Sequence, residues 1–427
     1  MGSEADFKTE LLERFLRYVR IHTESDARSD SFPSTPGQLT LLGMLADELR
    51  ALGVADVHQD EHGYVMATLP GTLPADIATE RRVPTVGWVA HVDTSPDVSG
   101  KNVKPQLIER YEGGVIALPG AEDQVIDPAE ESALAKAMGN TLVTTDGTTL
   151  LGADDKAGVA EIMTAVGYLV QHPEIERGPI ALAFTPDEEI GKGAQYFDIE
   201  RFGAKYAYTL DGADAGCVEF ETFSADAAEV IIDGRSQHPG YAKGKMVNAI
   251  KLAAEFVARL PKDSLSPELT AGREGFVHPT NVEGNVQRVV LSFILREFDT
   301  AKLVDQRKLL EGIAAEVAGI DERAKVTVEV SETYRNMGDA IGRVPFVVSH
   351  AEEAIRRTGI EPFSELVRGG TDGARLTAMG VPTPNLFTGG HNYHSRREWA
   401  NVDEMVKAVE VLIELAKIWG ERGEAKT

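Results

Sequence analysis

The sequence predicts an α/β fold, in which a sheet is flanked by helices, with a smaller inserted α+β domain. Three observations lead to this prediction. Short apolar runs alternate with helical patterns in the first half of the chain, as expected for strands buried on both faces of a sheet. The pattern then changes to long alternating strands and later reverts. A chain of 427 residues is also too long for one ordinary core. We therefore expect residues 1–221 and 333–427 to form one domain and residues 222–332 the other.

The first elements along the chain are two helices and a strand. Apolar residues recur at helical spacing over 5–20 and 38–53. Residues 83–90 form a nearly continuous apolar run that ends at His91, which is typical of a buried strand. The stretch 95–140 is rich in Gly, Pro and charged residues, so we expect a long surface insertion.

The next strands end in acidic residues. A helix is expected over 157–170, followed by a strand at 179–184 that leads into Pro186-Asp-Glu-Glu189. Another strand at 206–210 leads into Asp211-Gly212. Because each strand ends in acidic residues or His, the C-terminal edge of the sheet is expected to carry the chemistry.

The inserted domain is expected to be a small antiparallel sheet with helices on one face. Its strands are expected at 228–233, 286–298 and 325–332, and its helices at 247–260 and 301–318. The returning α/β part is expected to contain a helix at 345–358, a strand at 381–387 and a helix at 402–419.

Composition limits the classes of function. With 42% hydrophobic and 26% charged residues, the chain is typical of a soluble globular protein. A net charge of −25 disfavours nucleic acid and anionic membrane as partners. The N-terminal helix lacks the apolar core of a signal peptide, and no apolar run is long enough to span a bilayer. Cys217 is the one cysteine, which fits a reducing cytoplasm and restricts any metal site to His, Asp and Glu.

Oxygen and imidazole donors recur at or after the predicted strands of the first domain and before its helix at 157–170. They are His91-Val-Asp93, Asp154-Asp155 within Leu150–Gly158, Glu188-Glu189, Asp211, and the pair His391 and His394. Each motif alone is commonplace, but their joint position at one sheet edge favours a site for zinc, manganese or cobalt. Two adjacent zinc ions need a shared carboxylate, further ligands and a separate carboxylate as general base. Spacing leaves open which member of each adjacent pair would serve.

Residues two apart share a face of an extended segment, so Asp93 is expected to lie beside His91 and to orient its ring.

Longer motifs resemble those of the cocatalytic zinc exopeptidase family, which includes aminoacylase and glutamate carboxypeptidase. Within that family they are more similar to the branch that removes N-terminal residues from tripeptides than to the carboxypeptidases. The resemblance covers nearly the whole chain. The motifs are His91–Asp97 with Gly100–Pro105, Thr144–Gly158, Thr185–Ala194, Tyr208–Gly212, Leu295–Asp299 and Gly389–His394.

The resemblance implies a zinc-exopeptidase-like mixed sheet that binds two Zn²⁺ per subunit, and it chooses among the adjacent residues. The implied metal ligands are Asp154 as the bridge, His91 and Asp211 on one ion, and Glu189 and His394 on the other. Glu188 would be the general base, and Asp93 would support His91. Ser395 stands where the family pattern has a glycine after the histidine, but Glu398 keeps the family's spacing.

The resemblance also implies roles in the inserted domain. His238, within Ser236–Gly240, would donate to the developing oxyanion; the alternative is a turn histidine before Pro239. Arg296 would bind the substrate carboxylate, unless it is a surface arginine at a strand end. The segment Arg368–Gly373 resembles a substrate-contacting loop, and a plain glycine-rich turn is the alternative.

The implied activity is removal of the N-terminal residue from tripeptides by a dizinc-bound hydroxide, in a cytoplasmic enzyme. The inserted domain would act as a lid that measures peptide length, and it would pair with a second copy to form a homodimer. Two alternatives remain open. One is a related dizinc carboxypeptidase or N-acyl-amino-acid amidohydrolase, and the other is a non-catalytic metal-dependent binding protein.

Overall fold

The chain forms two units, each with its own hydrophobic core. The computed structural model describes residues 4–212 and 214–424. The first unit comprises Met1–Phe220, Asp339–Glu365 and Thr371–Thr427, and the second comprises Glu221–Gly338 and Leu366–Gly370.

A mixed sheet of seven strands organises the first unit. A mixed sheet is what the family resemblance implies. Its central strands β8, β3, β9 and β15 run parallel, whereas β1, β2 and β10 pair antiparallel with their neighbours. In spatial order the strands are β1 (Asp56–Gln59), β2 (Val65–Leu69), β8 (Ile180–Thr185), β3 (Val86–His91), β9 (Tyr206–Gly212), β15 (Asn385–Phe387) and β10 (Val218–Glu219).

Strand β3 is buried on both faces, which explains its continuous apolar sequence. Trp88 and Ala90 belong to the larger core cluster, whereas Val89 belongs to the cluster on the opposite face. Gly87 is needed for close packing, because a Cβ there would lie 2.3 Å from Cζ of Phe202. The tightly packed strand therefore places His91 at the edge of the sheet.

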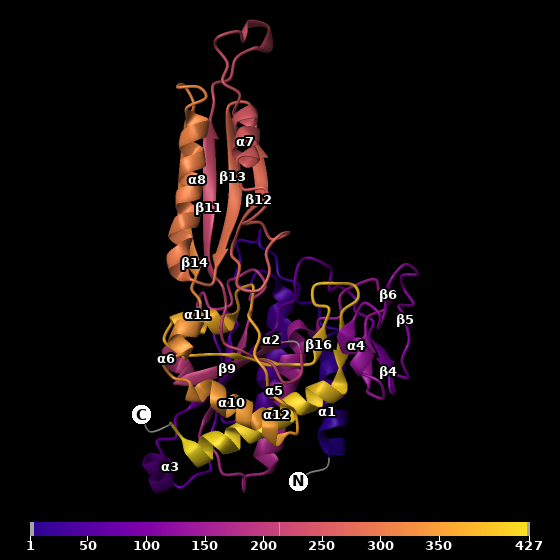
Figure 1. The fold of residues 1–427 in the computed structure, drawn as a ribbon. Coiled ribbons are helices and arrows are strands. Elements are labelled where there is room, and N and C mark those ends of the chain that lie inside the picture. The colour runs from indigo at the N-terminus through magenta and orange to yellow at the C-terminus, as the bar shows by residue number, and fades with distance from the viewer. Residues whose placement is uncertain (1–3, 213, 425–427) are drawn as a thin grey trace. The chain divides into compact units, whose positions relative to one another are not determined.

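Helices cover both faces of the sheet (Figure 1). On one face α5 packs against β3 and β9, and α1, α10 and α12 complete that layer. On the other face α6 and α11 pack against the sheet. The bounds are α1 (Glu4–Tyr18), α5 (Ala153–Gln171), α6 (Ile199–Phe202), α10 (Phe346–Arg357), α11 (Asp372–Ala378) and α12 (Val402–Arg422). The remaining helices are α2 (Pro36–Ala51), which packs on β1 and β2, α3 (Ala75–Arg81) and the short α9 (Gly338–Ile341).

The expectation of a surface insertion over 95–140 is only partly correct. This stretch contains short strands and a helix that share a core cluster with Leu142 and Trp399. Their apolar residues are too widely spaced to show a periodic pattern in the sequence. The elements are β4 (Gln106–Ile108), β5 (Ile116–Ala117), β6 (Val125–Ile126) and α4 (Ser132–Lys136). A second sheet has the order β16 (Gly390–His391), β17 (Trp399–Asn401), β7 (Leu142–Thr144) and β4.

The second unit is an antiparallel four-stranded sheet with α7 and α8 packed on it, which is the predicted α+β architecture (Figure 1). Asn248 begins α7 by accepting hydrogen bonds from the backbone N–H groups of Ile250 and Lys251. The elements are β12 (Phe276–Gly284), β13 (Arg288–Glu297), β11 (Ser224–Asp233) and β14 (Lys325–Tyr334) in spatial order, with α7 (Ala249–Ala258), α8 (Leu303–Ala318) and the 3₁₀ turns η1 (Pro239–Tyr241) and η2 (Thr300–Lys302).

Strand β12 has no counterpart in the sequence-based prediction. Pro279 lies inside it, and the register with β13 shifts between Pro279 and Asn281. Proline cannot donate a ladder hydrogen bond, so it is tolerated at a sheet edge, and β12 is an edge strand. Its mostly exposed residues removed the alternating apolar pattern that would have revealed it.

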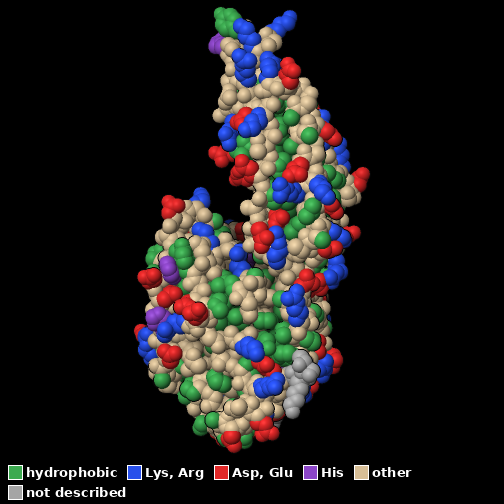
Figure 2. All heavy atoms as spheres, turned by 90° about the vertical axis from the view of Figure 1, so that its left-hand side faces the viewer, with side chains coloured by type: hydrophobic (Ala, Val, Ile, Leu, Met, Phe, Trp, Pro, Cys, Tyr) green, Lys and Arg blue, Asp and Glu red, His purple; other side chains and the backbone are tan. Residues whose placement is uncertain are grey.

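Acidic and basic side chains are interspersed over the face drawn in Figure 2. Among the described helices, none is both long and apolar enough to cross a membrane.

Candidate metal centre

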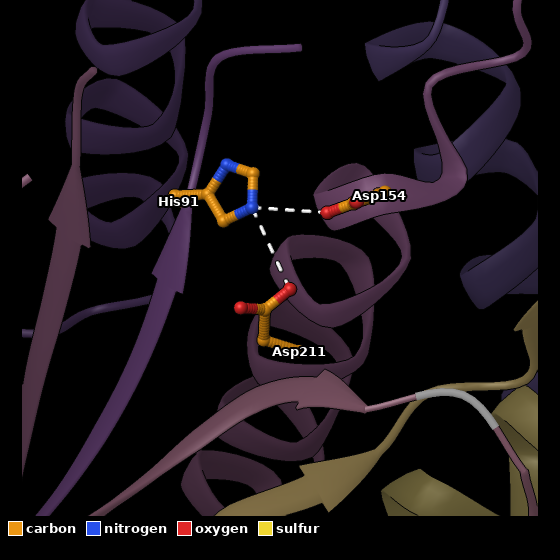
Figure 3. A group of neighbouring side chains, drawn as sticks. All are labelled: His91, Asp154 and Asp211. Carbon is orange, nitrogen blue, oxygen red and sulfur yellow. Dashed lines mark hydrogen bonds and ion pairs between the residues drawn. The ribbon is translucent and has the colours of Figure 1, made fainter. Parts of the chain in front are cut away.

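Three side chains from different elements meet at the C-terminal edge of the main sheet (Figure 3). His91 ends β3, Asp211 lies near the end of β9, and Asp154 lies in the first turn of α5. Nε2 of His91 is 3.0 Å from Oδ1 of Asp154 and 3.5 Å from Oδ1 of Asp211. One donor atom of each residue lies within 4.8 Å of the others, so the group could hold a metal ion.

The other carboxylate oxygen of Asp154 faces a second group. Nε2 of His394 is 3.2 Å from Oδ2 of Asp154 and 3.0 Å from Oε2 of Glu189. These three residues also offer donor atoms within 4.8 Å of one another. Asp154 therefore belongs to both groups and presents a different oxygen to each.

The alternative residues that spacing left open make other contacts. Asp155, joined to Asp154 by a cis peptide bond, accepts a hydrogen bond from the backbone N–H of His91 at 3.1 Å. Nε2 of His391 lies 2.9 Å from Oε2 of Glu404, and its ring stacks on Trp399. Both side chains are buried supports beside the groups.

Asp93 connects His91 to the loop that carries the glutamates. Nδ1 of His91 lies 3.1 Å from the backbone oxygen of Asp93 and 3.3 Å from its Oδ1. The same carboxylate accepts hydrogen bonds from the backbone N–H groups of Glu188 and Glu189, at 3.0 and 3.1 Å. Asp93 is fully buried, so these contacts fix both the ring and the loop.

Glu188 belongs to neither donor group. Burial raises the pKa of its carboxyl well above the ordinary value, and the negative charge of Asp211 contributes. Its neighbour Glu189 points into the second group instead, through the contact with His394.

The electrostatics of the two groups favour a cation. Burial raises the pKa of Asp211 to about 6 and that of Glu189 to about 8. Burial lowers the pKa of His91, but hydrogen bonds with the carboxylates raise it overall well above its ordinary value. Hydrogen bonds with Asp154 and Glu189 raise the pKa of His394 to about 11. A divalent ion would satisfy the carboxylates in place of the imidazole protons.

The donor chemistry fits such an ion. Each group combines imidazole nitrogen with carboxylate oxygens, which suits zinc. Oε1 of Glu189 is buried and has no hydrogen-bond partner among the described residues. Nδ1 of His394 lies 3.3 Å from Oδ2 of Asp97, so both ring nitrogens face carboxylates, as is common for a ligand histidine.

Glu398 anchors the loop that carries Asp154. Its carboxylate accepts hydrogen bonds from the backbone N–H groups of Leu151, Gly152 and Asp154, at 2.7, 2.8 and 3.1 Å. In the sequence, Glu398 is distinguished only by its spacing from His394. Asp97 ends the motif His91–Asp97, and no feature of the sequence connects it to His394.

The two residues predicted from the inserted domain lie in the second unit. His238 is exposed at the start of η1, and its Nδ1 accepts a hydrogen bond from the backbone N–H of Gly240 at 3.1 Å. Arg296 donates to the backbone oxygen of Leu295 at 3.0 Å, and its guanidinium lies over the ring of Tyr334. Both donor groups described above consist of first-unit residues alone.

The segment 368–373 is divided between the two units. Arg368 donates to the backbone oxygens of Gly272 and Glu274 at 2.6 and 3.0 Å, and its guanidinium lies over Phe223. Asp372 begins α11 and accepts a hydrogen bond from Thr185. The arginine therefore supports the second unit's own fold.

A mixed sheet with two groups of metal-ligating side chains at one edge, sharing one carboxylate, is an arrangement typical of metal-dependent hydrolases. Comparison with known proteins narrows the class. The chain belongs to peptidase family M20/M25/M40, whose model matches residues 141–418.

Curated relatives are similar over almost the whole chain. Peptidase T of Geobacillus thermodenitrificans is 48% identical over 415 residues, which cover 97% of this chain and 99% of the relative. Peptidase T of Bacillus subtilis is 48% identical over 410 residues, which cover 96% and 98%.

Solved structures have the same fold. The aminopeptidase PepT of Bacillus cereus superposes with a TM-score of 0.72 at 25% identity, covering 96% of this chain and 98% of that one. A tripeptidase of Staphylococcus aureus superposes with a TM-score of 0.75 at 23% identity, covering 97% and 99%. The likeness to the second structure concerns the fold alone.

Proposed function

We propose that the protein is a metallo-aminopeptidase that removes the N-terminal residue from tripeptides. The observation that carries the proposal is the position of Asp154, whose two oxygens face two separate donor groups. The relatives named peptidase T at 48% identity support the substrate class.

Two zinc ions per subunit are the proposed cofactors. His91 and Asp211 would hold one ion, Glu189 and His394 the other, and Asp154 would lie between them. When bound, such ions lower the pKa of a water molecule to about 7 and polarise the carbonyl of the scissile bond.

The chain's own carboxylates supply the proton chemistry. Glu188 lies in the same turn as Glu189 but in neither donor group, so its carboxylate is free to act as general base. It would take the proton of the attacking water and deliver it to the leaving amine. A raised pKa, caused by burial, suits a group that must hold that proton between the two steps. Asp93 would keep the His91 ring oriented.

The inserted unit, predicted as residues 222–332, is proposed to act as a lid. His238 would donate to the developing oxyanion and Arg296 would bind the far carboxylate of the peptide, which would limit substrate length. His238 is exposed, and the hydrogen bonds of Arg296 go to the backbone oxygens of Leu295 and Asp226.

We also propose that this unit pairs with a second copy of itself. An apolar hollow of about 450 Å³ lies along α7 and β12, where Ile250 and Val282 are 51% and 66% exposed. β12 is an edge strand with ladder groups available for pairing. A homodimer would cover both features. Sedimentation should then show dimers of the parent and monomers of Val282→Glu, whereas a monomeric parent would contradict the pairing.

The cytoplasm is the proposed location, supported by a single cysteine that is buried and free.

The experiment that tests the function is a substrate panel. Di-, tri- and tetrapeptides, and an N-acetylated tripeptide, are incubated with the purified protein with and without a chelator. The proposal predicts cleavage of free tripeptides at the first bond, loss of activity with chelator and recovery with zinc. Preference for the acetylated peptide would instead favour an N-acyl-amino-acid amidohydrolase, and release of the C-terminal residue a carboxypeptidase. Zinc binding without hydrolysis of any peptide would indicate a binding protein.

A further inference from the structure

Asp187 directly precedes the two site glutamates and has an unusual backbone conformation. Its φ angle is +56°, in the left-handed region that few side chains adopt. The residue is fully buried. The turn closes behind it, where Gly191 N–H donates to the Glu188 oxygen at 2.6 Å and Lys192 N–H donates to the Asp187 oxygen at 2.9 Å.

Two residues, Ser34 just before α2 and Gln38 in its first turn, bind the carboxylate of Asp187. Oδ2 accepts a hydrogen bond from the backbone N–H of Ser34 at 2.6 Å. Oδ1 accepts from the hydroxyl of Ser34 and from Nε2 of Gln38, the latter at 2.6 Å. Gln38 also binds the backbone of Asp187, because its Oε1 accepts a hydrogen bond from the backbone N–H of Asp187 at 3.0 Å. Ser34 is 6% exposed and Gln38 is fully buried, so solvent cannot replace these partners.

The glutamate turn is therefore held from two sides. Asp93 accepts from the backbone N–H groups of Glu188 and Glu189, while Ser34 and Gln38 hold the residue just before them. A carboxylate that accepts three short hydrogen bonds has one preferred orientation, and it fixes the backbone from which the next two side chains project.

We propose that Ser34, Gln38 and Asp187 are positioning residues, which fix the directions of the Glu188 and Glu189 side chains at the metal centre. The inference rests on the proposed function for the role of Glu188. Its consequence for Glu189 concerns metal binding and can be measured without turnover. Loss of the network would leave the fold of the sheet intact but let the glutamate turn rotate.

The decisive variant is Asp187→Asn. Asparagine tolerates the left-handed conformation about as well as aspartate, so the change removes the carboxylate without straining the backbone. One oxygen becomes an NH₂ group that must face a donor from Ser34 or Gln38. We expect kcat for a tripeptide and the affinity for zinc to fall by about 10-fold or more, as is typical when a support of a metal site is removed. KM should change by less.

Two further variants separate positioning from folding. Ser34→Ala removes one donor and should lower zinc affinity, whereas Ser34→Thr keeps the hydroxyl and should restore it. Ser29→Ala is the matched control, because the Ser29 hydroxyl pairs with the Ser31 hydroxyl in the same loop at 2.9 Å and has no hydrogen bond to Ser34, Gln38 or Asp187 among the described residues. It should behave as the parent.

The readouts are kcat and KM, zinc affinity by competition with a chromophoric chelator, and the unfolding midpoint of the metal-free protein. Parent-like kcat and zinc affinity in a folded Asp187→Asn protein would overturn the proposal. A loss of activity and zinc binding no larger than the fraction of unfolded protein would also overturn the proposal. If Asp187→Asn does not fold, Ser34→Ala against Ser34→Thr decides the same question. If the parent binds zinc but cleaves no peptide, the proposed function fails. The zinc affinities of the variants, compared with that of the parent, still test the positioning role.

Discussion

Oδ1 of Asp93 lies 3.3 Å from Nδ1 of His91, two residues earlier in the chain. The same carboxylate binds the backbone N–H groups of Glu188 and Glu189. One buried side chain therefore fixes the orientation of the His91 ring, whose Nε2 faces Asp154. It also fixes the position of the loop that carries both glutamates. Asp93 therefore connects the donor group that contains His91 with the donor group that contains Glu189.

Replacing Asp93 should weaken metal binding by both donor groups together. In Asp93→Asn, the new NH₂ group faces either the backbone N–H of Glu189, or that of Glu188 together with the His91 ring. We expect kcat/KM for a tripeptide and zinc affinity to fall by about 10- to 100-fold. Steady-state kinetics and chelator competition measure the two effects, and parent-like values of both in a folded Asp93→Asn protein would contradict the role of Asp93.

Replacing Glu188 should separate chemistry from metal binding. Glu188→Ala removes the proposed general base but none of the donor atoms of the two groups. Turnover should fall by about 10²- to 10⁴-fold, while elemental analysis still finds two zinc ions per chain. Near-normal turnover would contradict the assignment of Glu188 as the base.

Gly158 should be intolerant of a side chain. A Cβ there would lie 2.0 Å from the backbone oxygen of Leu210, so α5 would have to move away from β9. Because α5 carries Asp154 and β9 carries Asp211, we expect Gly158→Ala to lose about 1–3 kcal/mol of stability and to weaken zinc binding.

Gly167 in the same helix supplies the control for that variant. A Cβ there would lie 3.5 Å from Leu52, an ordinary contact, so Gly167→Ala should be neutral or stabilising. Thermal unfolding of the two variants checks the difference, and equal midpoints would contradict the packing argument.

Glu161 should make stability depend on pH. It is fully buried in α5, and neither carboxylate oxygen has a hydrogen-bond partner among the described residues. Burial raises its pKa well above 4.5. Above pH 4.5 the folded state therefore holds a proton that the unfolded state has released, so this residue's contribution to stability falls as pH rises.

Glu161→Gln removes that dependence. At pH 8 the variant should be more stable than the parent by about 1–3 kcal/mol, and the difference should shrink towards pH 4.5. Urea unfolding at both pH values measures it. A difference that grows towards acid pH would show that the carboxylate is ionised and stabilised in the fold.

The strand ends were predictable because local sequence defines them. His91 and Asp211 follow apolar runs long enough to read as buried strands, so their meeting at one edge follows from parallel pairing. The support network was not predictable. Ser34 and Gln38 lie about 150 residues from Asp187, and no local pattern specifies which buried polar groups will pair across that separation.

In the inserted unit, too, only strands with a buried face were predictable from the sequence. The strand β13 alternates buried and half-buried residues and was predicted, whereas the exposed edge strand β12, with Pro279 inside it, was missed. Burial patterns reveal elements that face a core, and edge elements carry a weaker signal.

Asp154 is proposed to lie between two metal ions. Diffraction from crystals of the zinc-loaded protein, recorded on both sides of the zinc absorption edge, tests it most directly. The account predicts two anomalous peaks about 3.5–4 Å apart, each about 2.0–2.2 Å from a different oxygen of Asp154. One peak would contradict it, as would two peaks to which Asp154 does not bind.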